Sequence, residues 1–147
     1  MIDDLDRKII GIMNVNARQS FRDIAKAAGT SVTSVIHKVK QMESTGAVQG
    51  YIPVVNAAAF GLDLTAIIAL RISKGKLLET QKRIAQDPRV SAVYDITGEW
   101  DSLVIGRFCS RDDLNAFIKK LLSLPNLDRS VTHLVLNTVK EERRVLV

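Results

Sequence analysis

The sequence predicts an α+β fold in two parts, and three observations lead to this prediction. Three short helical patterns follow one another within the first fifty residues. After residue 63, a strand, helix and strand pattern occurs twice in succession. A chain of 147 residues is long enough for two compact domains. We therefore expect a helical domain over 1–50, a strand or linker over 51–63 and a second domain over 64–147.

The first two helices are indicated by apolar spacing and by residues that suit their ends. Asp3 and Asp4 favour the N-terminus of the first helix, and its apolar face is expected to hold Leu5, Ile9, Ile12 and Met13. A short second helix begins at Ser20, with Asp23 as a capping-box-like partner, and Gly29 ends it. Its expected buried residues are Phe21, Ile24, Ala25 and Ala28.

The third helix begins at Ser31, which suits an N-cap, and ends near Gly46. Its expected buried residues are Val32, Val35, Val39 and Met42. Residues 48–55 are rich in β-formers, and Pro53 stops a helix there, so we expect a strand-like linker. The next residues, 56–63, fit either a loop or a short helical turn.

The second domain is expected to contain two βαβ units. The first consists of a strand over 64–72, a helix over 77–86 and a strand over 90–97. The second consists of a strand over 102–109, a helix from Ser110 to before Pro125 and a strand over 130–140. This βαββαβ order is typical of ferredoxin-like folds, in which both helices lie on one face of the sheet. The other face would be a large exposed apolar patch, so we expect subunits to dimerise through it.

The third helix has one face whose chemistry suits DNA. Opposite the apolar positions lie Thr33, Ser34, His37 and Gln41, with Lys38 and Lys40 on either side. Hydroxyl, imidazole and amide groups can bond to base edges, and ammonium groups suit phosphates. Every amphipathic helix has a polar face, however, so a solvated surface is the competing interpretation. The preceding helix and the glycine turn favour a helix-turn-helix, and the net charge of +5 adds weak support.

Several segments resemble the Lrp/AsnC family of feast/famine regulators. They include Leu5–Ile10, Asn16–Arg18, Asp23–Ala25 and residues 31–46, and the resemblance covers almost the whole chain. It implies a winged-type helix-turn-helix that binds double-stranded DNA as a dimer, with further assembly to a tetramer or octamer. The DNA-binding residues expected from the helix face and this resemblance are Ser31, Thr33, Ser34, His37, Lys38, Lys40 and Gln41. The sequence departs from the family at Thr30, where leucine is usual, and at 37–38, where arginines are common.

The resemblance also implies that the second domain senses an amino acid or related small molecule. The expected effector-binding residues are Gly98, Glu99, Trp100, Asp101, Thr132 and Leu134. A glycine turn can present backbone N–H groups to an anion, and the Asp101 carboxylate can receive an ammonium. The alternative is a purely structural hairpin. Trp100 stands where a tyrosine is common. His133 falls on the opposite strand face, and we expect a packed structural role for it.

The sequence indicates neither an enzyme nor a membrane protein. It has two histidines far apart, no phosphate-binding glycine loop and no metal-ligand spacing, so we expect no catalytic site and no cofactor. The single cysteine, Cys109, is expected to be buried. An acidic start and the lack of a long apolar run predict a cytoplasmic protein. Two alternatives stay open: an enzyme resembling the sirohaem decarboxylases, which share this fold, and an architectural DNA-compacting protein.

Overall fold

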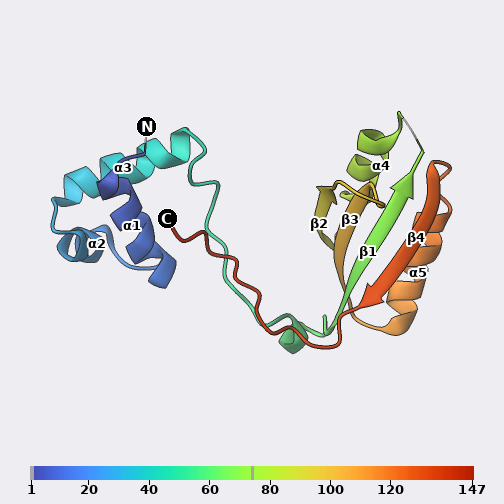
Figure 1. Ribbon diagram of the computed structural model, residues 1–147. Helices are drawn as coiled ribbons and strands as arrows, with labels where there is room; N and C mark the ends of the chain where they lie inside the picture. Colours follow the sequence, from blue (N-terminus) through green and yellow to red (C-terminus); the bar gives the residue numbers. More distant parts are fainter. Residues whose placement is uncertain (1, 74) are drawn as a thin grey trace. The chain divides into compact units, whose positions relative to one another are not determined.

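The computed structural model describes residues 2–73 and 75–147. It contains two compact units that divide between Val54 and Val55 (Figure 1). The C-terminal residues Lys140–Val147 belong to the first unit, where the side-chain amide of Asn14 donates to the carbonyl of Val145 at 2.9 Å. No helix in the described part of the chain is long and apolar enough to cross a membrane.

The first unit is built from three helices: α1 (Asp4–Val15), α2 (Phe21–Ala28) and α3 (Val32–Ser44). Asp3, Ser20 and Ser31 are their N-caps, as the sequence predicts for Ser20 and Ser31. The buried core consists of Ile9, Met13, Ile24, Ala25, Ala28, Val35, Val39 and Met42. Two predicted core residues, Phe21 and Val32, are instead exposed. Each is the first residue of its helix, where the incoming loop leaves one side of the turn open to solvent.

The turn between α2 and α3 depends on Gly29. This residue has φ 72°, a left-handed conformation that glycine adopts without steric cost. The N–H of Thr30 donates to the carbonyl of Ala25 at 3.0 Å, which closes the end of α2. The three helices and this tight turn form the predicted helix-turn-helix.

The segment that follows α3 differs from the prediction. Residues 48–55 contain no strand, and hence no wing strand, because they pair with no other strand in the described chain. The ambiguous segment after them contains a short 3-10 helix, η1 (Ala57–Phe60), capped by Asn56 and ended by Gly61 at φ 74°.

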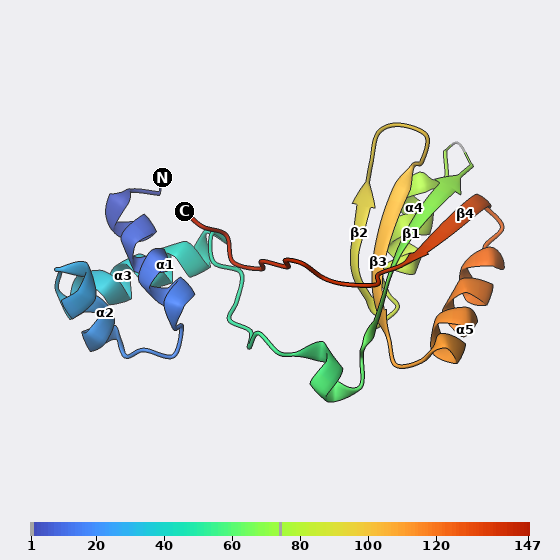
Figure 2. The ribbon, with the colours of Figure 1, turned by 60° about the horizontal axis from the view of Figure 1, so that its bottom comes forward.

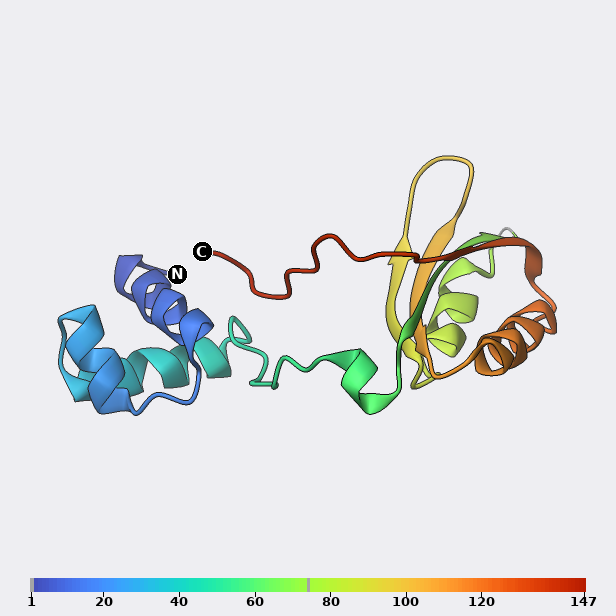
Figure 3. The same ribbon diagram turned by 90° about the horizontal axis from the view of Figure 1, so that it is seen from below.

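The second unit has the predicted ferredoxin-like order. It contains β1 (Leu64–Ile72), α4 (Leu77–Ile84), β2 (Val90–Asp95), β3 (Ser102–Phe108), α5 (Arg111–Leu122) and β4 (Leu127–Leu134). The strands form an antiparallel sheet in the order β2-β3-β1-β4. Both helices lie against one face of this sheet (Figure 3). The core between helices and sheet includes Ile68, Leu70, Val104, Phe108, Phe117 and Leu121.

Two predictions for this unit are wrong in detail. The last strand covers Leu127–Leu134 and not 130–140. Its pairing with β1 ends at Leu134 and Ala66, and one more hydrogen bond, from the Val135 N–H to the Thr65 carbonyl at 2.9 Å, brings it to the start of β1 at Leu64. Cys109 is exposed and not buried. It follows the last residue of β3, where the chain leaves the sheet for α5.

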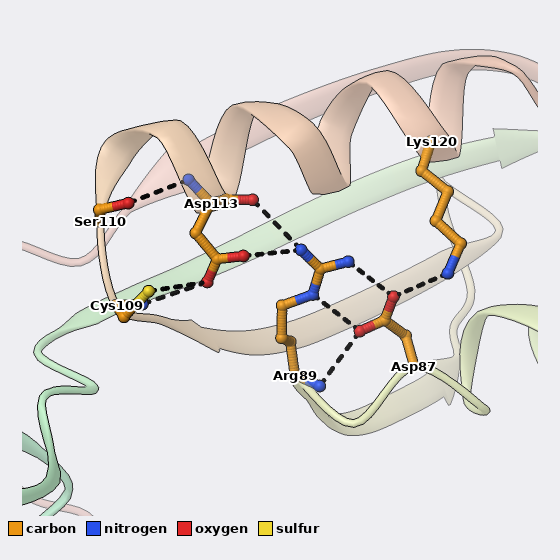
Figure 4. A network of polar contacts seen from close by, with 6 residues as sticks. All are labelled: Asp87, Arg89, Cys109, Ser110, Asp113 and Lys120. Atoms are coloured by element: carbon orange, nitrogen blue, oxygen red, sulfur yellow. Dashed lines mark hydrogen bonds and ion pairs between the residues drawn. The ribbon is translucent and has the colours of Figure 1, made fainter.

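A polar network joins the start of β2 to α5 (Figure 4). The guanidinium of Arg89 donates to both carboxylate oxygens of Asp87 and to Asp113, each at 2.8 Å. Lys120 reaches Asp87 at 3.0 Å. Because Arg89 hydrogen-bonds to them, the pKa values of Asp87 and Asp113 lie below their ordinary range. The network fixes α5 against the sheet.

The helix-free face of the sheet carries apolar side chains from all four strands. Alternation along each strand places them there: Ile67, Ala69, Ala92, Tyr94, Leu103, Ile105 and Val131. His133 shares this face and is exposed, so the packed role expected for it is not found in the single chain. Within the described part of the chain, no helix covers this face (Figure 3).

Candidate DNA interface and effector site

The outer face of α3 presents a set of unengaged polar side chains. Thr33, His37, Lys40 and Gln41 are exposed. Within the described part of the chain, their side chains make no hydrogen bond or ion pair. The buried residues Val35, Val39 and Met42 hold the opposite side of the helix against α1 and α2. The face therefore offers hydroxyl, imidazole and amide groups and the Lys40 ammonium to an external partner.

Two predicted DNA-binding residues, Ser31 and Ser34, also close the start of α3. The N–H of Ser34 donates to the Ser31 hydroxyl at 3.0 Å, and the two hydroxyls lie 2.8 Å apart. Ser31 is exposed and Ser34 half-buried. A base or phosphate that bonds to either hydroxyl must share it with the cap.

Lys38 lies differently from the rest of the face. Its ammonium contacts the carboxylate of Asp3 and reaches that of Asp6 at 3.3 Å. The same two aspartates form the capping box of α1, in which each carboxylate accepts from the other residue's backbone N–H at 2.9 Å. The side chains of Lys38 and Asp6 are 19% and 3% exposed. Lys38 therefore ties α3 to the start of α1.

The electrostatics of this cluster follow from the ion pairs. The hydrogen bond from Lys38 lowers the pKa of Asp3 to about 2, and the hydrogen bond to Asp3 raises the pKa of Lys38. The second oxygen of Asp6, Oδ1, is buried and has no hydrogen-bond partner among the described residues. These shifts favour the charged forms of Asp3 and Lys38.

The far end of α3 is tied to the segment after it. The hydroxyl of Tyr51 donates to the Glu43 carboxylate at 2.9 Å. Burial, followed by this contact, raises the pKa of Tyr51 to about 12. Glu43 is one of the residues that carry the family resemblance, and this hydrogen bond gives it a structural role.

Arg22 and Lys26 on α2 are both exposed, and neither is among the DNA-binding residues predicted from the sequence. They lie four residues apart on the first helix of the helix-turn-helix, and in such motifs this helix commonly crosses the phosphate backbone. The spacing of the two basic residues was the available signal.

The predicted effector loop, residues 98–101, joins β2 to β3 (Figure 2). Asp101 anchors it to β1: its N–H donates to the Leu70 carbonyl at 2.9 Å, and its Oδ2 accepts from the Ile72 N–H at 2.8 Å. Gly98 has φ 111°, which glycine allows. Trp100 is half-buried. The loop is therefore held at the end of the sheet by Asp101.

The structure does not bring Thr132 and Leu134 to this loop within one chain. They pair with Ile68 and Ala66, towards the other end of β1, and point to the helix-covered face. The β4 residue that meets the loop is Arg129, whose guanidinium lies 5.1 Å from the centre of the Trp100 ring. A role for Thr132 and Leu134 at the loop requires a second subunit and stays a prediction.

Comparison with known proteins agrees with both parts of the fold. Residues 2–43 match the AsnC-type helix-turn-helix domain, and residues 65–145 match the Lrp/AsnC ligand binding domain. The chain is 41% identical to an uncharacterised HTH-type transcriptional regulator of Pyrococcus abyssi, over 99% of both chains. It is 32% identical to the HTH-type transcriptional regulator Ptr1 of Methanocaldococcus jannaschii, over 96% of both.

Solved structures show the same fold. E. coli AsnC superposes with a TM-score of 0.89 at 24% identity and covers 97% of each chain. A Neisseria meningitidis transcriptional regulator in complex with L-Met gives a TM-score of 0.90 at 24% identity, over 99% of this chain and 96% of that one.

A helix-turn-helix with an open polar face, joined to a ligand-binding α+β domain, defines a DNA-binding transcriptional regulator. The two domain matches together cover most of the chain, and the identity to the Pyrococcus relative extends over nearly all of it. The chain belongs to the Lrp/AsnC family.

Proposed function

We propose that this regulator binds specific double-stranded DNA sequences in the cytoplasm through the outer face of α3, and that an amino acid or related molecule modulates this binding. The observation that carries the proposal is the exposed, unengaged set of Thr33, His37, Lys40 and Gln41. Hydroxyl, imidazole and amide groups suit base edges, and Lys40 suits a phosphate. Arg22 and Lys26 on α2 add phosphate contacts.

The assembly that we propose is a dimer formed through the helix-free face of the sheet, with tetramers or octamers built from it. Half-buried Ile67, Leu103, Ile105 and Val131 make this face apolar. A soluble protein rarely leaves such a patch uncovered. A dimer would present two recognition helices to major grooves about 34 Å apart, one turn of the duplex.

The loop over residues 98–101 supports an effector in the amino-acid class. It lies within the segment that matches the Lrp/AsnC ligand binding domain, and the second oxygen of Asp101 has no hydrogen-bond partner among the described residues. That oxygen can accept an ammonium. The L-Met complex of the Neisseria regulator supports the same class.

The experiment is fluorescence anisotropy with labelled duplexes from the protein's own upstream region, with and without each of the twenty amino acids. We expect one or a few amino acids to change the affinity severalfold, together with oligomer size in analytical ultracentrifugation. His37→Ala and Gln41→Ala should reduce the ratio of the affinity for this duplex to the affinity for a scrambled one. The matched control, Asn115→Ala on the exposed side of α5, should leave it unchanged. Equal effects of His37→Ala on both duplexes would count against base recognition by α3.

A further inference from the structure

Two arginines face each other across neighbouring strands beside the 98–101 loop. The β1 and β4 register pairs Arg71 directly with Arg129. Directly paired residues point to the same side of a sheet, and alternation from buried Leu70 and Ile72 places both arginines on the helix-free side. Like charges in this position repel each other, so the pair requires a negative partner.

Glu99 is the negative partner in the single chain. Its backbone carbonyl accepts a hydrogen bond from Arg71, and its carboxylate lies 3.6 Å from the Arg129 guanidinium. The Glu99 and Arg129 side chains are 66% and 65% exposed. In the single chain this ion pair is open to water and therefore weak, so a better-placed carboxylate can displace it. Arg71 and Arg129 lie at the loop end of the helix-free face, beyond Ala69 and Val131 of the apolar patch proposed for dimerisation.

We propose that Arg71 and Arg129 form a carboxylate-binding pair, and that the effector's carboxylate replaces the carboxylate of Glu99 there. This inference rests on the proposed effector function and names the ligand group that the site takes. A guanidinium presents two parallel N–H donors that match a carboxylate, and two guanidinium groups can hold its charge jointly.

The neighbours of the pair define the rest of the ligand. The Trp100 ring lies against the Arg129 guanidinium at 5.1 Å and offers an aromatic surface to an apolar side chain. The contacts of Asp101 with Leu70 and Ile72 hold the loop close to the arginines without using either guanidinium. The ligand class is therefore a small carboxylate with an apolar portion.

The test uses Trp100, the only tryptophan in the sequence, as a fluorescence reporter in the full-length protein. Iodide carries a negative charge and acrylamide does not, so the ratio of their quenching constants measures anion attraction at Trp100. We expect Arg71→Met and Arg129→Met each to lower this ratio about twofold and Glu99→Gln to raise it by a similar factor. Arg83→Met, which removes the same charge from α4, is the matched control and should leave it unchanged.

The second arm is competition by hexanoate and by hexanamide, which differ in the carboxylate. Hexanoate should protect Trp100 from iodide in the wild type and lose this effect in Arg71→Met, whereas hexanamide should protect in neither. Equal iodide-to-acrylamide ratios in the wild type and both arginine variants, or equal protection by the two probes, would overturn the proposal. This readout involves no DNA. A positive quenching result without any amino-acid effect on DNA binding would therefore reject the effector function and keep the carboxylate site.

Discussion

The contrast between Lys40 and Lys38 yields a quantitative prediction about DNA binding. Lys40 is exposed and unengaged among the described residues, whereas Lys38 pairs with Asp3 and Asp6. Each phosphate contact contributes about −0.9 to the slope of log affinity against log salt concentration. Lys40→Ala removes one such contact per subunit, so a bound dimer should lose about 1.8 from the magnitude of its slope.

This slope change corresponds to a measurable loss of affinity. With a slope difference of about 1.8, a fourfold rise in salt from about 50 to about 200 mM should lower the wild-type affinity roughly 12 times more than the Lys40→Ala affinity. The ratio of wild-type to Lys40→Ala affinity should therefore be roughly 12 times larger at the lower salt concentration. Anisotropy titrations at four salt concentrations measure it. Lys119→Ala on the exposed side of α5 is the charge-matched control and should keep the wild-type slope.

Lys38→Met should behave differently from Lys40→Ala. The Lys38 ammonium is already bound to Asp3 and Asp6, so we expect it to make no phosphate contact in the wild type. Its removal should therefore leave the slope unchanged. It should lower affinity by the same factor at every salt concentration, because α3 loses its tie to α1. If Lys38→Met flattened the slope as much as Lys40→Ala, the reasoning from the ion pairs would be refuted.

Three further predictions concern stability. Trp100 fluorescence reports unfolding of the second unit, and circular dichroism reports the loss of helix in the whole chain. Arg89→Met should lower the free energy of unfolding by about 2 kcal/mol at neutral pH, below the usual cost of breaking a buried pair because Asp87 keeps a second cation. Since Arg89 depresses the Asp87 pKa, that stabilisation is present above about pH 4 and lost as pH falls. In urea melts, the free energy of unfolding should therefore fall less on acidification in the variant than in the wild type. Equal decreases in the two proteins would contradict this. Gly106→Ala should cost about 1–3 kcal/mol, because a new Cβ would lie 2.8 Å from the buried Phe108 ring. Gly29→Ala should lower helix-domain stability by about 1 kcal/mol through its left-handed φ, and an unchanged melt would show that the turn relaxes.

Local patterns predicted the elements of the fold well. The bounds of β1, the N-caps Ser20 and Ser31 and the helix stop at Gly29 all depend on residues close in sequence, and the structure confirms them. The end of β4 depends instead on where its partner β1 begins, which no property of residues 130–140 reveals. Strand pairing is a long-range property, so the sequence pattern of residues 130–140 does not define where the last strand ends.

The candidate sites show the same distinction. Helical periodicity was enough to place Thr33, His37 and Gln41 on one exposed face of α3. It could not show that Lys38 is paired, because Asp3 lies 35 residues away in sequence. The juxtaposition of Arg71 and Arg129 likewise appears only once the β1 and β4 register is known. Contacts between distant segments account for what the sequence could not predict.

The most direct test of the central claim is equilibrium binding of the full-length protein to its own upstream region and to a scrambled duplex of equal length. Both are titrated at two salt concentrations with competitor DNA. A sequence-specific regulator should prefer the upstream duplex by roughly a thousandfold, and the preference should persist at the higher salt concentration. Equal affinities that fall together as salt rises would contradict specific recognition by α3 and favour an architectural protein.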